Sequence, residues 1–359
     1  MPFPDLIANI ASETLLFAVP LLLVALGGMF SWRGGIRNIA LDGTMIIGAL
    51  VASLLTSRFS DGTWATSHQI PAMLICVSAA CAAGLLFSLL LGFAAIRLRA
   101  DQNITGMSLN MLAPALAVVI TWSLFNKGRF ILTTTSFVGN RWQRIILGNS
   151  VVDPSAASAF LRAIFRNMYI TTPLAILLLV GAILLYKSRF GLRLRACGEN
   201  PEAAVAAGIR VNKMRWAGVL LSGALAGLGG FAFALAAGAG LQSTVAGYGF
   251  IALAVMVMGK QKPLPIAGFA LLLGFFKVIG NYAGLLPFLP SFEGIKFNSW
   301  IYNTLPYIAT LILLALFPKR RRAGLPYDKG AFPQRPIRTG PPLVEWPKPQ
   351  GGLYDKLLR

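Results

Sequence analysis

Long apolar stretches alternate with short polar ones along most of the chain, and this pattern predicts the fold class. Several of the stretches reach the roughly 18 to 20 residues that an α-helix needs to cross a bilayer. Backbone polar groups in lipid must be paired within their own segment, so each stretch is expected to be a helix and not a strand. The pattern therefore predicts an all-α integral membrane protein.

We expect about nine membrane-spanning helices, with a range of about eight to ten. They cover roughly residues 14–31, 38–57, 71–96, 103–125, 169–186, 216–238, 244–259, 264–282 and 301–317. Polar residues at the start of the second stretch indicate a broken or re-entrant helix near 36–45. The long loop 126–168 includes an amphipathic segment, 154–167, that is expected to lie in the membrane interface. The pattern assigns no role to this loop.

The basic residues gather at the ends of the apolar stretches. The chain carries 32 Lys and Arg against 12 Asp and Glu, a net charge of +20, with a mean hydropathy of +0.69. In a soluble protein this charge would suggest a nucleic-acid partner. Here it follows the positive-inside rule and favours contact with membrane lipid instead. We therefore expect no nucleic-acid partner, an N-terminus outside and a C-terminus in the cytoplasm of a bacterial inner membrane.

Two regions differ in composition. Residues 1–317 form the predicted transmembrane domain. Residues 318–359 begin with a run of four basic residues and contain eight prolines. Such a tail cannot bury a core, so we expect it to be extended in the cytoplasm, near anionic lipid or a cytosolic partner.

A short charged segment, 190–213, interrupts the apolar pattern in the second half of the chain. Asn200 can cap a helix, Pro201 fits its first position, and Glu202 favours the positive end of the helix dipole. Small alanine side chains follow, and Gly208 is expected to end the helix. A compact helix held at the membrane surface suits docking into a groove on a partner protein.

The sequence offers no catalytic machinery. Gly259-Lys260 lacks the upstream glycine and following Ser or Thr of a phosphate-binding loop. The chain has one histidine, His68, and three cysteines that form no framework. The glycine run 223–230 lies inside an apolar stretch, which indicates close helix packing and not a nucleotide loop. We expect no enzyme activity, metal or cofactor in this chain.

Polar residues within the apolar stretches are costly in a membrane and are candidates for a substrate path. The candidates are Asn38, Asp42, Asn103, Asn110, Lys277 and Asn281. Asp42 could cap a half-helix or pair with Arg33 or Arg37, or it could line the path. The asparagines could join helices by hydrogen bonds instead. Lys277 could reach the outer headgroups or line an outward vestibule.

Two motifs carry a resemblance to a known family. The segment FGLRLRACGENPEAAVAAG, residues 190–208, resembles the cytoplasmic coupling segment of bacterial ABC importers, and Glu202-Ala203-Ala204 with Gly208 matches its EAA-x-x-x-G pattern. RNIALDG, residues 37–43, is similar to the "VNIGLEG" signature of the ribose, nucleoside and branched-chain amino-acid group. Asp42 and Ala40 stand where that signature has Glu and Gly. The resemblance covers about residues 14–318 and is closest to the permeases of nucleoside importers served by basic-membrane-type lipoproteins.

The resemblance implies a permease subunit that transports nucleosides, or a related small polar solute, by alternating access. It implies three protein partners: a related permease, a cytoplasmic double-cassette ATPase that holds ATP and Mg²⁺, and an extracytoplasmic binding lipoprotein. The residues implied in ATPase coupling are Gly198, Glu199, Asn200, Pro201, Glu202, Ala203, Ala204 and Gly208.

Other functions remain open at this stage. Within the same family the substrate could be a simple sugar such as ribose, or a branched-chain amino acid. A secondary transporter would need intramembrane carboxylates in functional positions. Asp42 is the single acid available for that role in the predicted spans, and the charged helix near 200 would then have no purpose.

Overall fold

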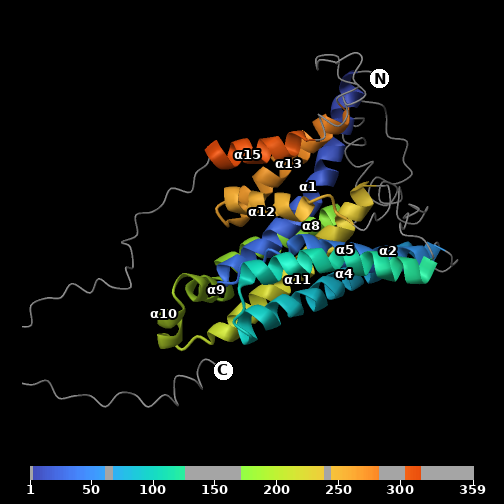
Figure 1. The fold of residues 1–359 in the computed structure, drawn as a ribbon. Coiled ribbons are helices and arrows are strands. Elements are labelled where there is room, and N and C mark those ends of the chain that lie inside the picture. The colour runs from blue at the N-terminus through green and yellow to red at the C-terminus, as the bar shows by residue number, and fades with distance from the viewer. Residues whose placement is uncertain (1–2, 61–67, 126–170, 238–243, 283–303, 317–359) are drawn as a thin grey trace, which may run out of the picture.

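The computed structural model describes residues 3–60, 68–125, 171–237, 244–282 and 304–316, which form helices joined by short connections (Figure 1). The helices are α1 (Phe3–Arg33), α2 (Leu41–Ser60), α4 (Gln69–Gly92), η1 (Phe93–Arg97, a π-helical turn), α5 (Gln102–Phe125), α8 (Thr171–Lys187), α9 (Arg189–Glu199), α10 (Pro201–Ala206), α11 (Val211–Ala237), α12 (Tyr248–Met258), α13 (Pro263–Tyr282) and α15 (Leu305–Leu316). The amphipathic segment 154–167 and the tail 318–359 lie outside the described residues.

The predicted all-helical membrane fold is confirmed, but the predicted number of about nine spans is not. Within the described residues, six helices are long and apolar enough to cross a membrane: α1, α2, α4, α5, α11 and α13. α8 and α9 meet at a bend of 68° and together can form a seventh span. α12 has 11 residues and is therefore about 16 Å long, which is half a bilayer.

Helix α11 occupies the centre of the bundle and packs against α1, α2 and α4. Glycines make this close packing possible, as the sequence predicts. Gly227 lies directly against the backbone of Gly84 on α4 and Gly48 on α2, and Gly223 lies against Ser88. A side chain at these glycines would push the helices apart, because in lipid helix association depends on such close backbone contact.

Residues 34–40 connect α1 to α2 without forming a helix, in the region where a broken or re-entrant helix is expected. Ile36, Asn38 and Ala40 are each at most 2% exposed, whereas Arg37 is exposed. This alternation is typical of an extended segment with one buried face. The first residue of α2, Leu41, packs against Gly28, more than a turn before the end of α1. The chain therefore turns back into the bundle before α2 begins.

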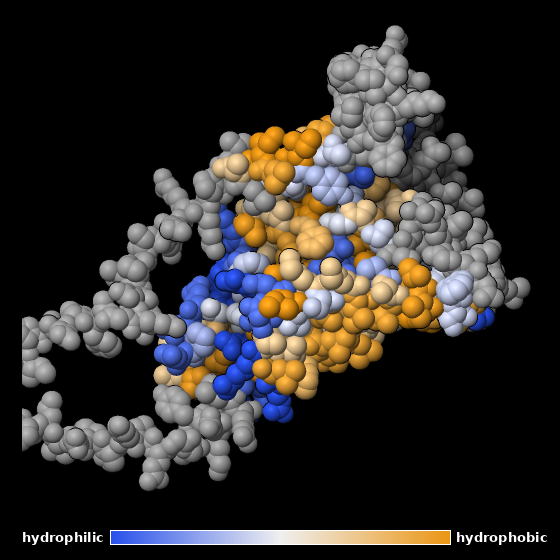
Figure 2. All heavy atoms as spheres, viewed as in Figure 1, coloured by the Kyte–Doolittle hydropathy of each residue, from blue (hydrophilic) through white to orange (hydrophobic). Residues whose placement is uncertain are grey.

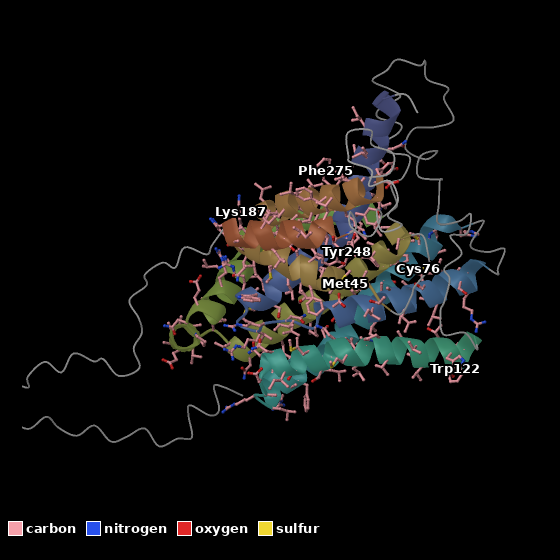
Figure 3. The ribbon with its side chains drawn as sticks, turned by 45° about the horizontal axis from the view of Figure 1, so that its top comes forward. Met45, Cys76, Trp122, Lys187, Tyr248 and Phe275 are labelled. Carbon is pink, nitrogen blue, oxygen red and sulfur yellow. The ribbon has the colours of Figure 1, made fainter. Side chains whose placement is uncertain are left out.

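The periphery of the bundle is apolar. Met45, Cys76 and Tyr248 lie inside it, whereas Trp122 on α5 and Phe275 on α13 are 64% and 40% exposed (Figure 3). Exposed apolar side chains also follow α4, α5, α8, α13 and α15. Large exposed apolar surfaces mark contact with lipid or another protein, which agrees with a membrane-embedded subunit.

Candidate coupling site and substrate path

Hydrophilic side chains gather at the end of the bundle where α9 and α10 lie (Figure 2). We call this the basic end. It brings together the end of α1, the extended segment 34–40, the π-helical turn η1, helices α9 and α10, and the turn between α12 and α13. Segments that are far apart in the sequence therefore meet on one surface.

The charged segment forms two helices, α9 and α10, where the sequence predicts one. Ser188 begins α9, and its hydroxyl accepts a hydrogen bond from the Gly191 amide. The Asn200 side chain accepts one from the Ala203 amide at 3.1 Å, and Pro201 opens α10. Gly208 follows the helix with a φ of +75°. The predicted cap, first position and end of the short helix are thus confirmed.

Helices α9 and α10 form one body with the start of α11. Cys197, Ala204 and Val211, one from each helix, are buried against one another in a small apolar cluster. Burial raises the pKa of the Cys197 thiol, although the nearby Arg215 opposes this shift. Glu202, Ala203 and the residues 206–208 stay exposed on the outer side of α10. We call α9 and α10 together the α9–α10 module. Its side that faces the start of α11 is buried, and its opposite side is exposed and consists mainly of small side chains.

The module meets α1 by direct backbone contact. Gly198, in the last turn of α9, lies against the Arg33 carbonyl, and a Cβ added there would come within 3.1 Å of the Gly35 nitrogen. Gly35 has a φ of +88°, a left-handed conformation that favours glycine. This contact is called the α1–α9 joint below. It leaves no space for a side chain at Gly198.

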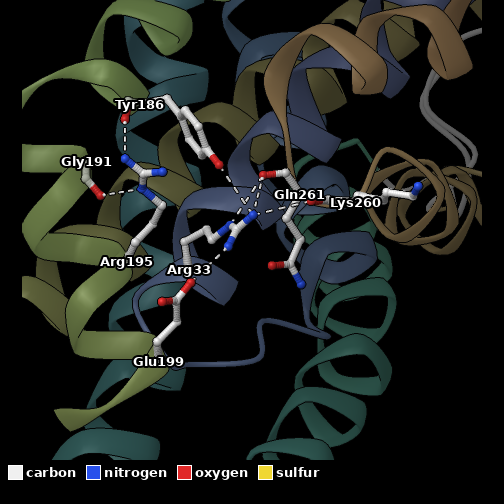
Figure 4. A network of polar contacts seen from close by, with 7 residues as sticks. All are labelled: Arg33, Tyr186, Gly191, Arg195, Glu199, Lys260 and Gln261. Carbon is white, nitrogen blue, oxygen red and sulfur yellow. Dashed lines mark hydrogen bonds and ion pairs between the residues drawn. The ribbon is translucent and has the colours of Figure 1, made fainter. Parts of the chain in front are cut away.

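Arg33 ties the joint to the rest of the basic end (Figure 4). Its guanidinium donates hydrogen bonds to the carbonyl oxygens of Lys260 and Gln261 at 3.3–3.4 Å, and its Nη1 lies 3.7 Å from the Glu199 carboxylate. Lys260 and Gln261 have φ values of 51° and 55°, which non-glycine residues rarely adopt. Arg33 thus stabilises a strained turn between α12 and α13 and links it to α9.

Tyr186, near the end of α8, completes this network. Its hydroxyl accepts a hydrogen bond from Arg33 at 3.4 Å, and the Arg195 guanidinium lies 4.4 Å from the centre of its ring. Arg195 also donates to the Tyr186 and Gly191 carbonyl oxygens, which holds the sharp bend between α8 and α9. The network therefore joins α1, α8, α9 and the α12–α13 turn.

The structure brings three of the six candidate path residues together around the extended segment. Asn38 is 1% exposed and donates from Nδ2 to the Ser222 hydroxyl of α11 at 2.9 Å. Asn110 on α5 donates to the Ile39 carbonyl at 2.9 Å and accepts from the Gly43 amide at 2.8 Å. These asparagines pair backbone and side-chain groups that helical hydrogen bonds leave unmet, so both hold the re-entrant chain in place.

Asp42 lies between two helix N-termini. It stands in the first turn of α2, and its Oδ1 accepts a hydrogen bond from the Gly249 amide at the start of α12, at 2.9 Å. α12 extends about 15 Å from the Arg33-bound turn to this contact, and Asp42 is buried inside the bundle, 8% exposed. A carboxylate is favoured there by the positive ends of both helix dipoles. The half-helix cap is the alternative that this geometry supports.

The other three candidates lie elsewhere. Asn103 is exposed in the first turn of α5 at the basic end, where its backbone N–H donates to the Asp101 carboxylate. Lys277 is partly buried on α13, and Asn281 is exposed one turn further on. Next to them, Tyr282 donates to Glu13 of α1 at 2.7 Å. Lys277 and Asn281 therefore lie toward the end of the bundle opposite the basic end.

Sequence reasoning missed several residues of the site. Arg33 and Lys260 enter it only as basic residues at the ends of apolar stretches, and Gln261 does not enter it. No local pattern reveals that Arg33 binds the carbonyl oxygens of Lys260 and Gln261. The buried Tyr248 hydroxyl and Asn38 Oδ1 have no hydrogen-bond partner in the described part of the chain. Tyr248 starts α12 beside Asp42, after Gly247 with a φ of +72°, and this glycine is the one local signal of a helix start there.

Replacing Asn110 with alanine is expected to lower the melting temperature of the purified protein by several degrees. The Ile39 carbonyl and the Gly43 amide would both lose their partner, at about 1–3 kcal/mol each, and each kcal/mol corresponds to about 2–4 °C. Thermal unfolding monitored by intrinsic fluorescence measures this. Asn103→Ala is the matched control, since Asn103 is exposed on the same helix. Equal melting temperatures for the two variants would contradict the role given to Asn110.

Comparison of the sequence with known proteins identifies relatives of this chain. A family model described as the branched-chain amino acid transport system / permease component matches residues 10–316. The guanosine ABC transporter permease protein NupQ of Bacillus subtilis (strain 168) is 37% identical over 336 residues, which cover 92% of this chain and 99% of NupQ. The nucleoside ABC transporter permease protein NupC of Lactococcus lactis subsp. cremoris (strain MG1363) is 38% identical over 311 residues, 86% of this chain and 92% of NupC. NupB of the same strain, another nucleoside ABC transporter permease protein, is 27% identical over 271 residues, 74% of this chain and 70% of NupB. No solved structure matches.

Proposed function

Because the chain belongs to the family of permease components of branched-chain amino acid transport systems, we propose that it is the transmembrane permease subunit of an ATP-driven nucleoside importer. The observation that carries this proposal is the packed module of α9 and α10, which projects from one end of an apolar helical bundle. The relatives NupQ and NupC of this chain are nucleoside-type permeases. Simple sugars and branched-chain amino acids are the alternative substrates that an experiment has to separate.

The chain forms the path and does not hydrolyse ATP itself. ATP and Mg²⁺ bind to a cytoplasmic double-cassette ATPase, and a second, related permease completes the path. The likeness to both NupB and NupC of one bacterial strain supports such a pair. An extracytoplasmic binding protein delivers the substrate. The basic end faces the cytoplasm of the inner membrane, with the N-terminus outside and the C-terminal tail inside.

The module of α9 and α10 transmits motion between the ATPase and the spans. Glu202 and the low alanine surface of α10 dock on the ATPase, while Asn200 and Pro201 fix where α10 begins. Gly198 and Glu199 connect the module to α1. Gly208 ends α10 and lets the chain turn toward α11. Because Arg33 binds both the module and the α12–α13 turn, displacement of the module moves α12 as well. Such rigid-body transmission suits alternating access.

The N-terminal end of α12, which contacts Asp42, is where this motion reaches the substrate path. Asp42 holds α12 against α2 inside the bundle, with Asn38 and Asn110 holding the chain before it. We assign these three residues to the shape of the path and not to direct binding. Lys277 and Asn281 lie on the outward half, and Asn103 on the cytoplasmic mouth. A shift of α12 would break or form the contact between the Asp42 carboxylate and the Gly249 amide.

The test is the ATPase activity of this permease co-purified with its partner permease and ATPase in lipid nanodiscs. Binding protein loaded with adenosine, guanosine, ribose or leucine is added in turn. We expect stimulation by a nucleoside. Stimulation by ribose or leucine alone would overturn the substrate and keep the importer, whereas failure of any ATPase to co-purify would overturn the importer itself.

A further inference from the structure

A pocket at the basic end borders the α9–α10 module where α11 begins and is lined by none of the candidate substrate-path residues. It has a volume of about 770 Å³ and lies between the η1–α5 connection and the first turns of α11. Its polar and aromatic lining consists of Arg97, Arg99, Gln102, Asn212, Lys213, Arg215 and Trp216. We call it the basic pocket.

The basic pocket carries unbalanced positive charge. Four of its lining residues are cationic, and none of its lining residues is acidic. Arg215 Nε is buried without a hydrogen-bond partner in the described part of the chain. The nearby acid Asp101 lines a separate pocket, and its Oδ1 already accepts from the amides of Asn103 and Ile104. A buried cationic donor without a partner is costly. Arg97, Arg99 and Lys213 are exposed, and an anion in the pocket would balance the charge of all four side chains.

The surrounding elements favour a phosphate group. The pocket includes residues of the first turn of α11, a helix of 27 residues, and helix N-termini favour anions. Three arginines offer the planar donor pairs that match phosphate oxygens. Phosphate chemistry therefore fits both the charge and the donor geometry of the site.

The position of the basic pocket indicates where the phosphate comes from. Leu90, Phe93 and Leu98, on the elements that lead into the pocket, are 50%, 54% and 64% exposed. Trp216 packs its ring against Gly92, at the point where these apolar side chains give way to Arg97 and Arg99. Tryptophan and basic residues at such a boundary are typical of the headgroup level of a membrane.

We propose that the basic pocket binds the phosphate of an anionic phospholipid headgroup, with the acyl chains lying along the exposed apolar side chains of α4 and η1. Arg97, Arg99, Lys213 and Arg215 contact the phosphate oxygens, and Trp216 packs beside the glycerol region. Basic pockets between membrane helices are the kind of site that holds anionic headgroups. Because residues 207–210 alone separate α10 from α11, a bound lipid also fixes the base of the coupling module.

The experiment titrates the purified full-length protein in neutral detergent with phosphatidylglycerol or phosphatidylcholine, and counts bound lipids by native mass spectrometry. The main variant is R97Q/K213Q, because both side chains are exposed. R215Q is a second variant, since Arg215 also lies beside the buried Cys197. The matched control is R189Q/R193Q, which removes the same charge from exposed positions at the same end, outside the pocket lining. A competition arm adds inorganic phosphate.

We expect the wild-type protein and the control to retain phosphatidylglycerol in preference to phosphatidylcholine, and R97Q/K213Q to bind it at least tenfold more weakly. Competition by inorganic phosphate at concentrations equal to the lipid would assign the site to a soluble phosphate and overturn the lipid source. Equal affinities for the two lipids, or equal loss in R189Q/R193Q, would overturn the proposal altogether. The readout is independent of transport, so its failure leaves the proposed importer function untouched.

Discussion

Glu202→Arg is expected to abolish uptake, and to prevent the permease from co-purifying with its ATPase, while the protein still inserts into the membrane. Glu202 is exposed in the first turn of α10, where its carboxylate is favoured by the helix dipole. Its side chain makes no hydrogen bond or ion pair within the described part of the chain, so we expect the reversal to leave the fold intact. In the proposed docking, a cation in its place would face the groups of the ATPase that pair with the carboxylate, and such like-charge contacts cost several kcal/mol. That corresponds to a loss of at least about 100-fold in docking affinity.

The matched control for this prediction is Glu202→Gln at the same position. It removes the charge without reversing it, and the loss of the dipole interaction alone is worth about 0.3–1 kcal/mol. We therefore expect near-normal assembly and a modest decrease in uptake. Uptake of a loaded nucleoside by membrane vesicles, together with the amount of ATPase retained on the purified permease, separates the two variants. Normal uptake by Glu202→Arg would mean that α10 does not couple to the ATPase.

The bounds of α10 could be predicted from sequence because their signals are local. Asn200, Pro201 and Gly208 each act within a few residues of their own position, and the structure places all three as expected. The sequence did not predict α9 as a separate helix, because a residue that holds it in place is distant in the sequence. Gly198 contacts Arg33, which is 165 positions earlier, and no pattern within either segment shows that contact.

The predicted number of about nine spans is not confirmed within the described residues, and α12 illustrates why hydropathy alone does not give that number. Hydropathy measures how apolar a stretch is, and α12 is as apolar as a full span. Its length is limited instead by Asp42, which meets its first turn in the interior, and by the turn that Arg33 holds at the other end. Both limits are tertiary contacts. Asp42 and Asn110 likewise bind backbone groups of residues distant in the sequence. The polarity of a residue in an apolar stretch does not indicate such a partner.

Gly198→Val is the second change with a large expected effect, because it acts on the α1–α9 joint itself. The added side chain would press against the Arg33 carbonyl and the Gly35 amide. Overpacking of this kind costs about 1–3 kcal/mol, and the strain is relieved if α9 moves away from α1. The module would then no longer carry α12 with it. We expect uptake, and ATPase stimulation by loaded binding protein, to fall by at least tenfold, while unstimulated ATPase activity and co-purification of the ATPase are kept.

Gly181→Val on α8 is the matched control, because an added Cβ there has no atom within 4 Å. We expect this variant to transport normally. The separation of basal from stimulated ATPase activity is what distinguishes a coupling joint from a merely structural contact. A misfolded permease would lose both activities together with its ATPase, whereas a broken joint leaves an assembled complex that hydrolyses ATP without responding to substrate. If Gly198→Val keeps its stimulation, α9 reaches the spans by another route, and the Arg33 network with Tyr186 and the α12–α13 turn would have to carry the motion alone.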